Sequence, residues 1–308
     1  MNLTSDGPQR AAVVLAGGDG VRLSDLTHKI LGRHVPKQFC PLVGRTTPLE
    51  QTRRRLSLTV PSSRTVVMVT RAHAPFYAPL LSDLSSRNLV AQPTNRGTAP
   101  AILYGLLRLA ELGAGLNVVV MPSDHYVDDD AAFMDHVELA FQTIDERPEL
   151  TILLGIAPDE AETAYGWIEP AQPVSPEHAP ISRVRRFWEK PSRQVAENLL
   201  TRGCLWNSFV MVARVSTLLG LCMIAMPELC TSFSALRASL GTIHEERLAQ
   251  ALYSNLHTAD FSQRVLARFP INLSVLPVDG VAWSDLGEPR RVFDTLSRLG
   301  LRPSWAAA

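Results

Sequence analysis

Glycines and a basic residue stand close together near the start of the chain. Gly17, Gly18 and Gly20 directly follow the apolar run 11–16, and Arg22 comes two residues later. Glycines let the backbone approach a ligand and expose N–H groups to phosphate oxygens, and a guanidinium adds a forked donor. The spacing fits neither GxGxxG nor GxxxxGK[ST]. The segment therefore predicts either a phosphate-binding loop or an ordinary tight turn after a buried strand.

Two further side chains could act on a phosphate group. Lys37 follows Pro36 in the same connection, and a lysine held there could neutralise charge on a transferring group, although most lysines are simply solvated. Asp124 comes just after the apolar run 117–121. A carboxylate at a strand end suits Mg²⁺, which takes oxygen ligands and keeps several waters.

A second acidic group, Asp128–Asp130, lies close to Asp124. A DxD pattern would suit a metal-dependent glycosyltransferase that holds a nucleotide sugar. Acidic residues directly before a helix also cap its first N–H groups and complement its dipole. We favour capping of a helix over 131–146.

The segment 92–100 leads into an apolar helical stretch. Thr98 would be a good N-cap for that helix, and Pro100 suits its first turn. A helix start offers free N–H groups to an anion. Taken alone, the segment could be no more than a capped helix.

The elements that would position these side chains alternate along the first half. Strand-like runs cover 11–16, 65–70, 117–121 and 151–156, and helical stretches cover 49–58, 98–112 and 131–146. This alternation predicts an α/β, Rossmann-like fold, with a mostly parallel twisted sheet and helices on both faces. Ligands of such sheets bind at the carboxyl ends of the strands.

The second half is less regular. Strand-like runs cover 166–169, 181–188, 205–213 and 271–277, and a closing helix covers 290–299. A helix-rich insertion at about 216–267 could support a dimer contact or pack on the core. The glycine-rich hexapeptide repeats of a C-terminal β-helix are absent, so we expect a single domain over 1–308.

Composition excludes several classes of function. The 308 residues include 30 basic and 30 acidic side chains, so the formal net charge of zero argues against a nucleic-acid or membrane partner. The four cysteines form no CxxC pair, which favours free thiols in a reducing cytoplasm over a zinc site. The apolar region 215–227 is too short to span a bilayer, and the first ten residues do not resemble a signal peptide. We expect a cytoplasmic protein.

Seven motifs, taken in order and with the glycine loop and PKQF counted as one, resemble one family. GGDGVRL (17–23) with PKQF (36–39) resembles the signature of sugar nucleotidyltransferases, the NDP-sugar pyrophosphorylases, and the PKQF form is similar to the mannose-1-phosphate guanylyltransferase branch. The other resembling segments are QPTNRGTAP (92–100), PSDH (122–125), YGWIE (165–169), FWEKP (187–191), WNS (206–208) and WSDLG (283–287). The resemblance implies a GT-A-like fold, with a nucleotide-binding half at about 11–160 and a sugar-phosphate half at about 161–295.

The resemblance also implies site residues by position. Nucleotide contacts would come from Ala16, Gly17, Gly18, Gly20, Gln92, Asn95, Arg96, Gly97, Thr98 and Ser123. The catalytic cations would be Arg22, Lys37 and Lys190. Sugar-phosphate contacts would come from Gly166, Glu169, Glu189, Lys190 and Asn207. Mg²⁺ would be held by Asp124 and Asp285.

The implied reaction joins an NTP and a sugar 1-phosphate into a nucleotide sugar with release of pyrophosphate. GTP with mannose 1-phosphate is the expected pair. The same chemistry with dTTP or UTP and glucose 1-phosphate is an alternative, as is a regulatory subunit that binds a nucleotide sugar. The protein could also form a homodimer.

Three positions depart from the family's pattern. Asp25 stands where proline is usual, the span 28–35 is longer than usual, and Phe209 stands where glycine is usual. These departures leave open the loop geometry before Lys37, the backbone path at Phe209 and the choice of nucleotide and sugar.

Overall fold

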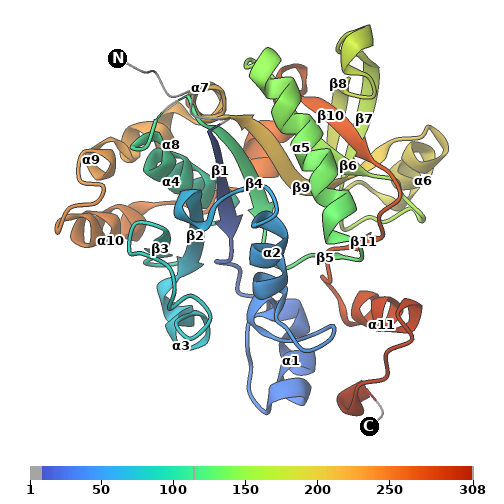
Figure 1. Cartoon of the computed structure of the whole chain (residues 1–308), viewed down its shortest axis with the longest axis horizontal. Coiled ribbons are helices and arrows are strands. Elements are labelled where there is room, and N and C mark those ends of the chain that lie inside the picture. Colours follow the sequence, from blue (N-terminus) through green and yellow to red (C-terminus); the bar gives the residue numbers. More distant parts are fainter. Residues whose placement is uncertain (1–8, 114, 307–308) are drawn as a thin grey trace.

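The computed structural model describes residues 9–113 and 115–306. Within them, the main sheet has the strand order β3-β2-β1-β4-β9-β6-β10-β8-β7, and β5 pairs with β11 in a small second sheet (Figure 1). The strands are β1 (Arg10–Leu15), β2 (Thr65–Thr70), β3 (Leu89–Gln92), β4 (Asn117–Pro122), β5 (Tyr126–Val127), β6 (Thr151–Ile156), β7 (Gly166–Pro173), β8 (Ser182–Glu189), β9 (Leu205–Arg214), β10 (Ser274–Val278) and β11 (Trp283–Ser284).

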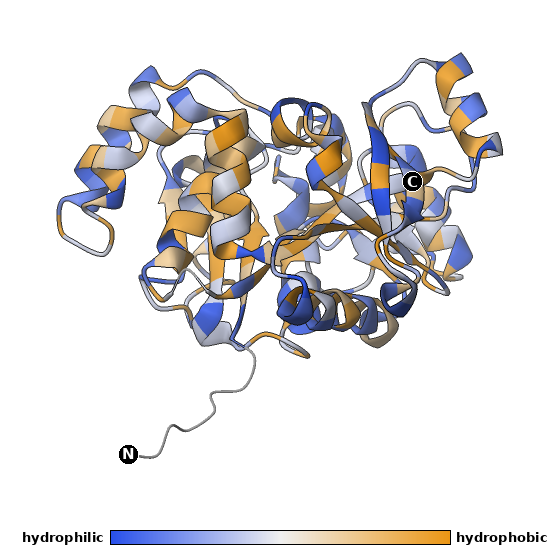
Figure 2. Cartoon of the chain, turned by 90° about the horizontal axis from the view of Figure 1, so that it is seen from above, coloured by the Kyte–Doolittle hydropathy of each residue, from blue (hydrophilic) through white to orange (hydrophobic). Residues whose placement is uncertain are grey.

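Helices cover both faces of the main sheet (Figure 2). They are α1 (Ser24–Leu31), α2 (Pro48–Leu56), α3 (Ala74–Tyr77), α4 (Thr98–Ala110), α5 (Asp130–Glu146), α6 (Arg193–Thr201), α7 (Val215–Ala225), α8 (Pro227–Ser232), α9 (Ser234–Arg237), α10 (Glu245–Asn255) and α11 (Pro289–Arg298). The prediction of an α/β fold with two helical layers is confirmed.

Two apolar clusters lie on opposite faces of the sheet, because successive residues of a strand point to opposite sides. In β1, Ala12 and Val14 join the cluster under α2 and α5, whereas Ala11 and Val13 join the cluster under α4 and α7. The helices present apolar stripes to these clusters; in α5 the buried positions recur at helical spacing from Phe133 onward.

The sheet is mixed, whereas the alternation of elements predicted a mostly parallel one. Strands β3, β2, β1 and β4 are parallel to one another. Strand β9 then lies antiparallel between β4 and β6, and β7 and β8 add further antiparallel pairs. The strands of the second half were located within a few residues, but a linear pattern does not specify which strand inserts between two others.

Asp25 and the first half of the longer span 28–35 fall in α1. Residues 28–31 complete this helix, whose C-cap is Gly32 with φ 68°, and residues 32–35 follow it without helix or strand. Asp25 lies in the first turn, where a carboxylate complements the helix dipole and where proline would also fit. The backbone that leads to Lys37 therefore accommodates both departures.

The acidic group before α5 has structural partners. Asp129 is the N-cap of α5 and accepts a hydrogen bond from the Ala132 N–H at 2.9 Å. Asp128 accepts one from the Ala282 N–H at 2.8 Å, and Asp130 pairs with the buried Arg55. The capping prediction is confirmed.

The helix-rich insertion packs on the parallel half of the sheet. Helices α7 and α10 contribute to the same apolar cluster as α4, and the Tyr104 hydroxyl of α4 donates to Glu245 of α10 at 2.7 Å. Among the described residues, no helix is long and apolar enough to cross a bilayer. The cysteines are free thiols, as expected: Cys40, Cys204 and Cys222 are buried and Cys230 is half-buried.

Candidate active site

A cavity of about 370 Å³ opens at the carboxyl ends of β1, β3 and β4. It collects residues that the sequence predicted as a site and that lie far apart in the chain. Those on its wall are Gly17, Gly18, Gln92, Asn95, Gly97, Thr98, Asp124, Gly166, Glu189, Asn207 and Asp285. Gly18 and Asp124 also line a neighbouring cavity of about 310 Å³, whose wall includes Gly20, Arg22 and Lys37.

The glycine loop is held in place by the segment that carries Lys37. The Gln38 side-chain amide donates to the carbonyl oxygens of Ala16 at 3.0 Å and Gly18 at 2.7 Å. Gly20 has a left-handed φ of 63°, and a Cβ there would lie 2.8 Å from the Lys37 backbone nitrogen. The close approach therefore requires glycine at this position.

Lys37 contacts both residues that are predicted to hold a metal. Its Nζ is 3.1 Å from Asp124 Oδ2 and donates to the main-chain carbonyl of Asp285 at 2.6 Å. Only 11% of the Lys37 side chain is exposed. A buried cation at this point would stabilise negative charge that develops on a reacting phosphate.

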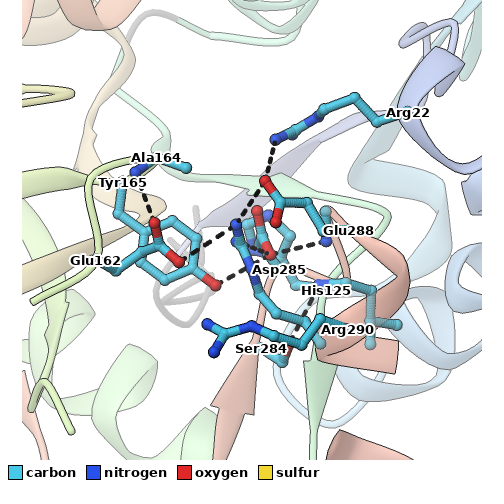
Figure 3. A network of polar contacts seen from close by, with 12 residues as sticks. Arg22, His125, Glu162, Ala164, Tyr165, Ser284, Asp285, Glu288 and Arg290 are labelled. Atoms are coloured by element: carbon cyan, nitrogen blue, oxygen red, sulfur yellow. Dashed lines mark hydrogen bonds and ion pairs between the residues drawn. The ribbon is translucent and has the colours of Figure 1, made fainter. Parts of the chain in front are cut away.

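The Asp285 carboxylate is fixed by three donors that share one of its oxygens (Figure 3). Oδ1 accepts from the Tyr165 hydroxyl at 3.0 Å, from Arg291 at 2.7 Å and from the Gly287 N–H at 2.8 Å. Burial alone would raise the pKa of Asp285, but the charges of Lys37 and Arg291 outweigh it and hold that pKa below its ordinary value. The carboxylate is therefore an anion, and the three donors to Oδ1 leave Oδ2 available.

These carboxylates fit a divalent cation. Asp285 offers Oδ2, and Asp124 offers oxygens that contact only Lys37 and, at 3.5 Å, the His125 ring among the described residues. Hard oxygen donors of this kind suit Mg²⁺, which is usually held by one or two carboxylates together with substrate phosphates and water. In residues 9–113 and 115–306, no cluster of three or more such side chains forms a complete protein cage.

Arg22 and His125 flank this centre. Arg22 is 60% exposed and its guanidinium lies 3.7 Å from Glu288 (Figure 3), so it is placed to exchange that partner for a phosphate. His125 packs edge-on against Trp283, with ring centroids 5.1 Å apart. Burial lowers the pKa of His125 to about 4, which keeps the ring neutral.

Residues of the predicted nucleotide segment also line the larger cavity. Gln92 ends β3 and is buried, and Asn95 accepts a hydrogen bond from the Gly97 N–H at 2.9 Å. The helix start differs from the prediction, because Gly97 is the N-cap of α4 and no side chain caps it. The Thr98 hydroxyl instead accepts from the Phe261 N–H at 2.8 Å.

Three of the predicted sugar-phosphate residues, Gly166, Glu189 and Asn207, lie where β7, β8 and β9 meet. A Cβ on Gly166 would lie 2.7 Å from the Phe187 ring, so glycine permits β7 to pack closely beside Glu189. Burial, together with the charge of Asp260, raises the pKa of Glu189. Asn207 lies on the same wall, and its side chain accepts from the Phe209 N–H at 3.1 Å.

Phe209 keeps the backbone conformation that glycine would adopt. Its φ is 59°, which a non-glycine residue adopts at a cost of about 1–2 kcal/mol. The hydrogen bond from its N–H to Asn207 supports this turn, and the Phe209 side chain becomes part of the cavity wall. The third departure therefore changes the wall rather than the backbone path.

Five predicted residues lie outside both cavities: Ala16, Arg96, Ser123, Glu169 and Lys190. The buried Ser123 hydroxyl donates to the Leu15 carbonyl at 2.8 Å, and Glu169 pairs with Arg202 and Arg185. Lys190 is 64% exposed, with its Nζ 3.7 Å from Glu189. The structure does not bring these side chains to the cavity, and their predicted contacts stay predictions.

Other residues of the site were missed by sequence reasoning. Gln38 supports the glycine loop, Arg291 orients Asp285, and Asp260 lines the cavity beside Glu189. Gln38 could have been noticed because it stands inside the PKQF segment. Asp260 and Arg291 lie in a helix-rich block and a closing helix, where polar residues give no distinguishing pattern.

The fold and the cavity together define a class of phosphate-binding α/β protein. The chain matches the Nucleotidyl transferase family over residues 11–299 and belongs to it. Members of this family act on an NTP and a sugar 1-phosphate and generally use a divalent metal ion.

Particular relatives refine this assignment. The mannose-1-phosphate guanylyltransferase of Klebsiella pneumoniae is 34% identical over 206 residues, which cover 66% of this chain and 42% of that protein. Mannose-1-phosphate guanylyltransferase 2 of Escherichia coli O157:H7 is 28% identical, over 92% of this chain and 59% of that protein. The chain thus spans about half the length of these relatives.

A solved structure from Thermus thermophilus, described as a mannose-1-phosphate geranyltransferase, is 30% identical with a TM-score of 0.79. The match covers 92% of this chain and 79% of that one. The likeness extends through both halves of the sheet.

Proposed function

We propose that the protein transfers a nucleotidyl group from GTP to mannose 1-phosphate and forms GDP-mannose and pyrophosphate with Mg²⁺. The observation that carries the proposal is that Lys37 contacts both Asp124 and Asp285, which line one cavity together with Gly17, Gly18, Glu189 and Asn207. The relatives whose names specify mannose 1-phosphate support this pair of substrates.

The reaction requires no covalent intermediate on the protein. A phosphate oxygen of the sugar 1-phosphate forms a bond to the α-phosphorus of the NTP, and the bond from that phosphorus to the bridging oxygen of the β-phosphate breaks. Pyrophosphate leaves with the electron pair. In-line geometry needs the attacking and leaving oxygens on opposite sides of the α-phosphorus.

The residues of this chain would position the substrates and neutralise charge. Glycine-loop N–H groups and Arg22 would hold the triphosphate, and Lys37 would stabilise charge at the transferred phosphorus. Asp124 and Asp285 would hold Mg²⁺, which supplies further charge stabilisation when bound. Glu189 and Asn207 would bind sugar hydroxyls, and Lys190 would approach the sugar phosphate.

The test is a pyrophosphate-release assay with MgCl₂ that crosses four NTPs with mannose 1-phosphate and glucose 1-phosphate. Release confined to GTP with mannose 1-phosphate is expected. Pyrophosphate release with another pair would support nucleotidyl transfer but reject GTP and mannose 1-phosphate as the substrates. No release with any pair would reject the proposed function.

Matched variants connect the assay to the site. Asp124→Asn should abolish release at any practical Mg²⁺ concentration. Asp128→Asn is the control, because an asparagine oxygen can still accept from the Ala282 N–H. If Asp128→Asn abolished release and Asp124→Asn did not, the metal would lie at the DxD group instead.

A further inference from the structure

The helix-rich insertion reaches the predicted nucleotide segment and holds it. The Ala259 N–H donates to the Arg96 carbonyl at 3.0 Å, and the Ala259 carbonyl accepts from the Ala99 N–H at 3.0 Å. A Cβ on Gly97 would lie 2.4 Å from that same carbonyl. The segment thus packs directly against the end of the insertion, with glycine at the closest approach.

Tyr253 of α10 makes two contacts with this segment. Its hydroxyl donates to Gln92 Oε1 at 3.0 Å, and its carbonyl accepts from Arg96 Nε at 3.1 Å. The Tyr253 side chain is buried and contacts Phe233 edge-on at 6.2 Å between ring centroids. It is therefore a fixed part of the insertion rather than a surface side chain.

The orientation of the Gln92 amide follows from its two partners. The Val69 main-chain carbonyl lies 3.4 Å from Nε2 and can only accept, so the NH₂ group must face it. Oε1 must then face Tyr253, which supplies the hydrogen. Gly17 makes this arrangement possible, because a Cβ there would lie only 3.0 Å from Nε2.

One N–H of the Gln92 amide remains available. The Val69 carbonyl uses one of the two hydrogens on Nε2, and no second acceptor for Nε2 exists among residues 9–113 and 115–306. Gln92 lies on the wall of the larger cavity. It therefore offers an N–H donor to a base bound there, while Oε1 already accepts from Tyr253.

We infer that Tyr253 is a positioning residue that holds the Gln92 amide as a donor toward the base, and so favours keto bases over amino bases. Guanine presents O6, and thymine or uracil presents O4, as an acceptor, whereas adenine and cytosine present an amino donor at the equivalent place. A donor facing a donor leaves both unpaired. The inference rests on the proposed function and assigns the insertion a role in choosing its nucleotide.

The experiment compares GTP, ITP and ATP in wild type and in Tyr253→Phe. Wild type should prefer GTP and ITP over ATP, since inosine keeps O6 and lacks only the 2-amino group. Tyr253→Phe should lower the GTP-to-ATP ratio of kcat/KM about tenfold, the factor that corresponds to about 1.4 kcal/mol for one buried hydrogen bond. An unchanged ratio in a folded Tyr253→Phe protein would overturn the inference.

The matched control is Tyr104→Phe. The Tyr104 hydroxyl is also buried and also joins the core to the insertion, but its partner is Glu245 and not a residue of the cavity. Tyr104→Phe should lose about as much free energy of unfolding as Tyr253→Phe, but it should keep the wild-type GTP-to-ATP ratio of kcat/KM. Equal relaxation in both variants would show that loosening the insertion, rather than orienting Gln92, alters the ratio.

A double-mutant cycle isolates the coupling. Gln92→Met removes the donor, so Tyr253→Phe should have no further effect on the ratio in that background. Additive effects would contradict a role exerted through Gln92.

Equilibrium binding of GTP and ATP, measured by calorimetry, separates this inference from the proposed function. If nucleotide binds with the expected preference but no pyrophosphate is released, only the proposed function fails. If wild type binds ATP as tightly as GTP, the inference fails whatever the activity.

Discussion

Gly20→Ala should lower the activity of the protein by displacing Lys37. The Cβ of alanine would lie 2.8 Å from the Lys37 backbone nitrogen and 3.2 Å from Pro36 Cα. Ordinary contacts begin at 3.4 Å, and both neighbours are backbone atoms that cannot rotate away. The segment that carries Lys37 must therefore retreat from the glycine loop.

The size of the effect follows from what Lys37 contacts. Its Nζ is held 3.1 Å from Asp124 Oδ2 and 2.6 Å from the Asp285 carbonyl, so a backbone shift alters the centre where the transferred phosphate would lie. Misplacement by about 1 Å can cost about 10²-fold in rate, and we expect a loss of that order in kcat/KM. The left-handed φ adds about 1–2 kcal/mol of destabilisation.

Gly32→Ala separates the two effects. Gly32 has nearly the same φ, 68°, but nothing lies within 4 Å of a Cβ built there. It should show a similar loss in urea-unfolding free energy with activity close to wild type in the pyrophosphate-release assay. Equal loss of activity in both variants would attribute the effect to backbone strain, and full activity in Gly20→Ala would refute the reasoning.

Two further predictions concern charge. Lys190→Ala should lower kcat/KM for the sugar 1-phosphate about 10²-fold, because electrostatic stabilisation of the phosphate is lost. The urea-unfolding midpoint should stay unchanged, because the Lys190 side chain is 64% exposed. An unchanged kcat/KM would reject the proposed role of Lys190. Arg291→Met should reduce the free energy of unfolding by about 3 kcal/mol, because it leaves the Asp285 and Glu162 carboxylates buried without their partner. The neighbouring Arg290→Met removes an exposed pair with Glu160 and should leave the urea midpoint nearly unchanged, so equal losses would contradict the argument.

Local patterns predicted the strands and the loops at their ends. β2 and β6 have the predicted bounds, β4 extends one residue further, and β1 is shifted by one residue at both ends. Apolar runs that break into glycine, or into Pro-Ser-Asp, mark the carboxyl ends of buried strands, and the fold brings such ends to one edge. Gly17, Gly18 and Asp124 could therefore be placed in one site from the sequence.

Contacts between distant segments could not be predicted in this way. Tyr253 and Gln92 are separated by 161 positions, and nothing in the composition of α10 distinguishes its tyrosine from an ordinary core residue. The interpretation of Thr98 as an N-cap failed for a related reason: its hydroxyl is used by Phe261, from the end of the insertion. Threonine is a common N-cap residue, but here the Thr98 hydroxyl accepts a hydrogen bond from a distant segment and does not cap α4.

The antiparallel insertion of β9 between β4 and β6, which the sequence did not specify, explains how Asn207 and Asp124 come to line one cavity. Strand β9 pairs with β4 so that Val120 opposes Met211, and with β6 so that Ile156 opposes Trp206. Because β9 runs in the opposite direction, its first residues lie where β4 and β6 end. Asn207 therefore stands at the same edge as Asp124, although it begins a strand rather than ending one. A wholly parallel sheet would have sent the start of this strand to the far edge, away from the glycine loop.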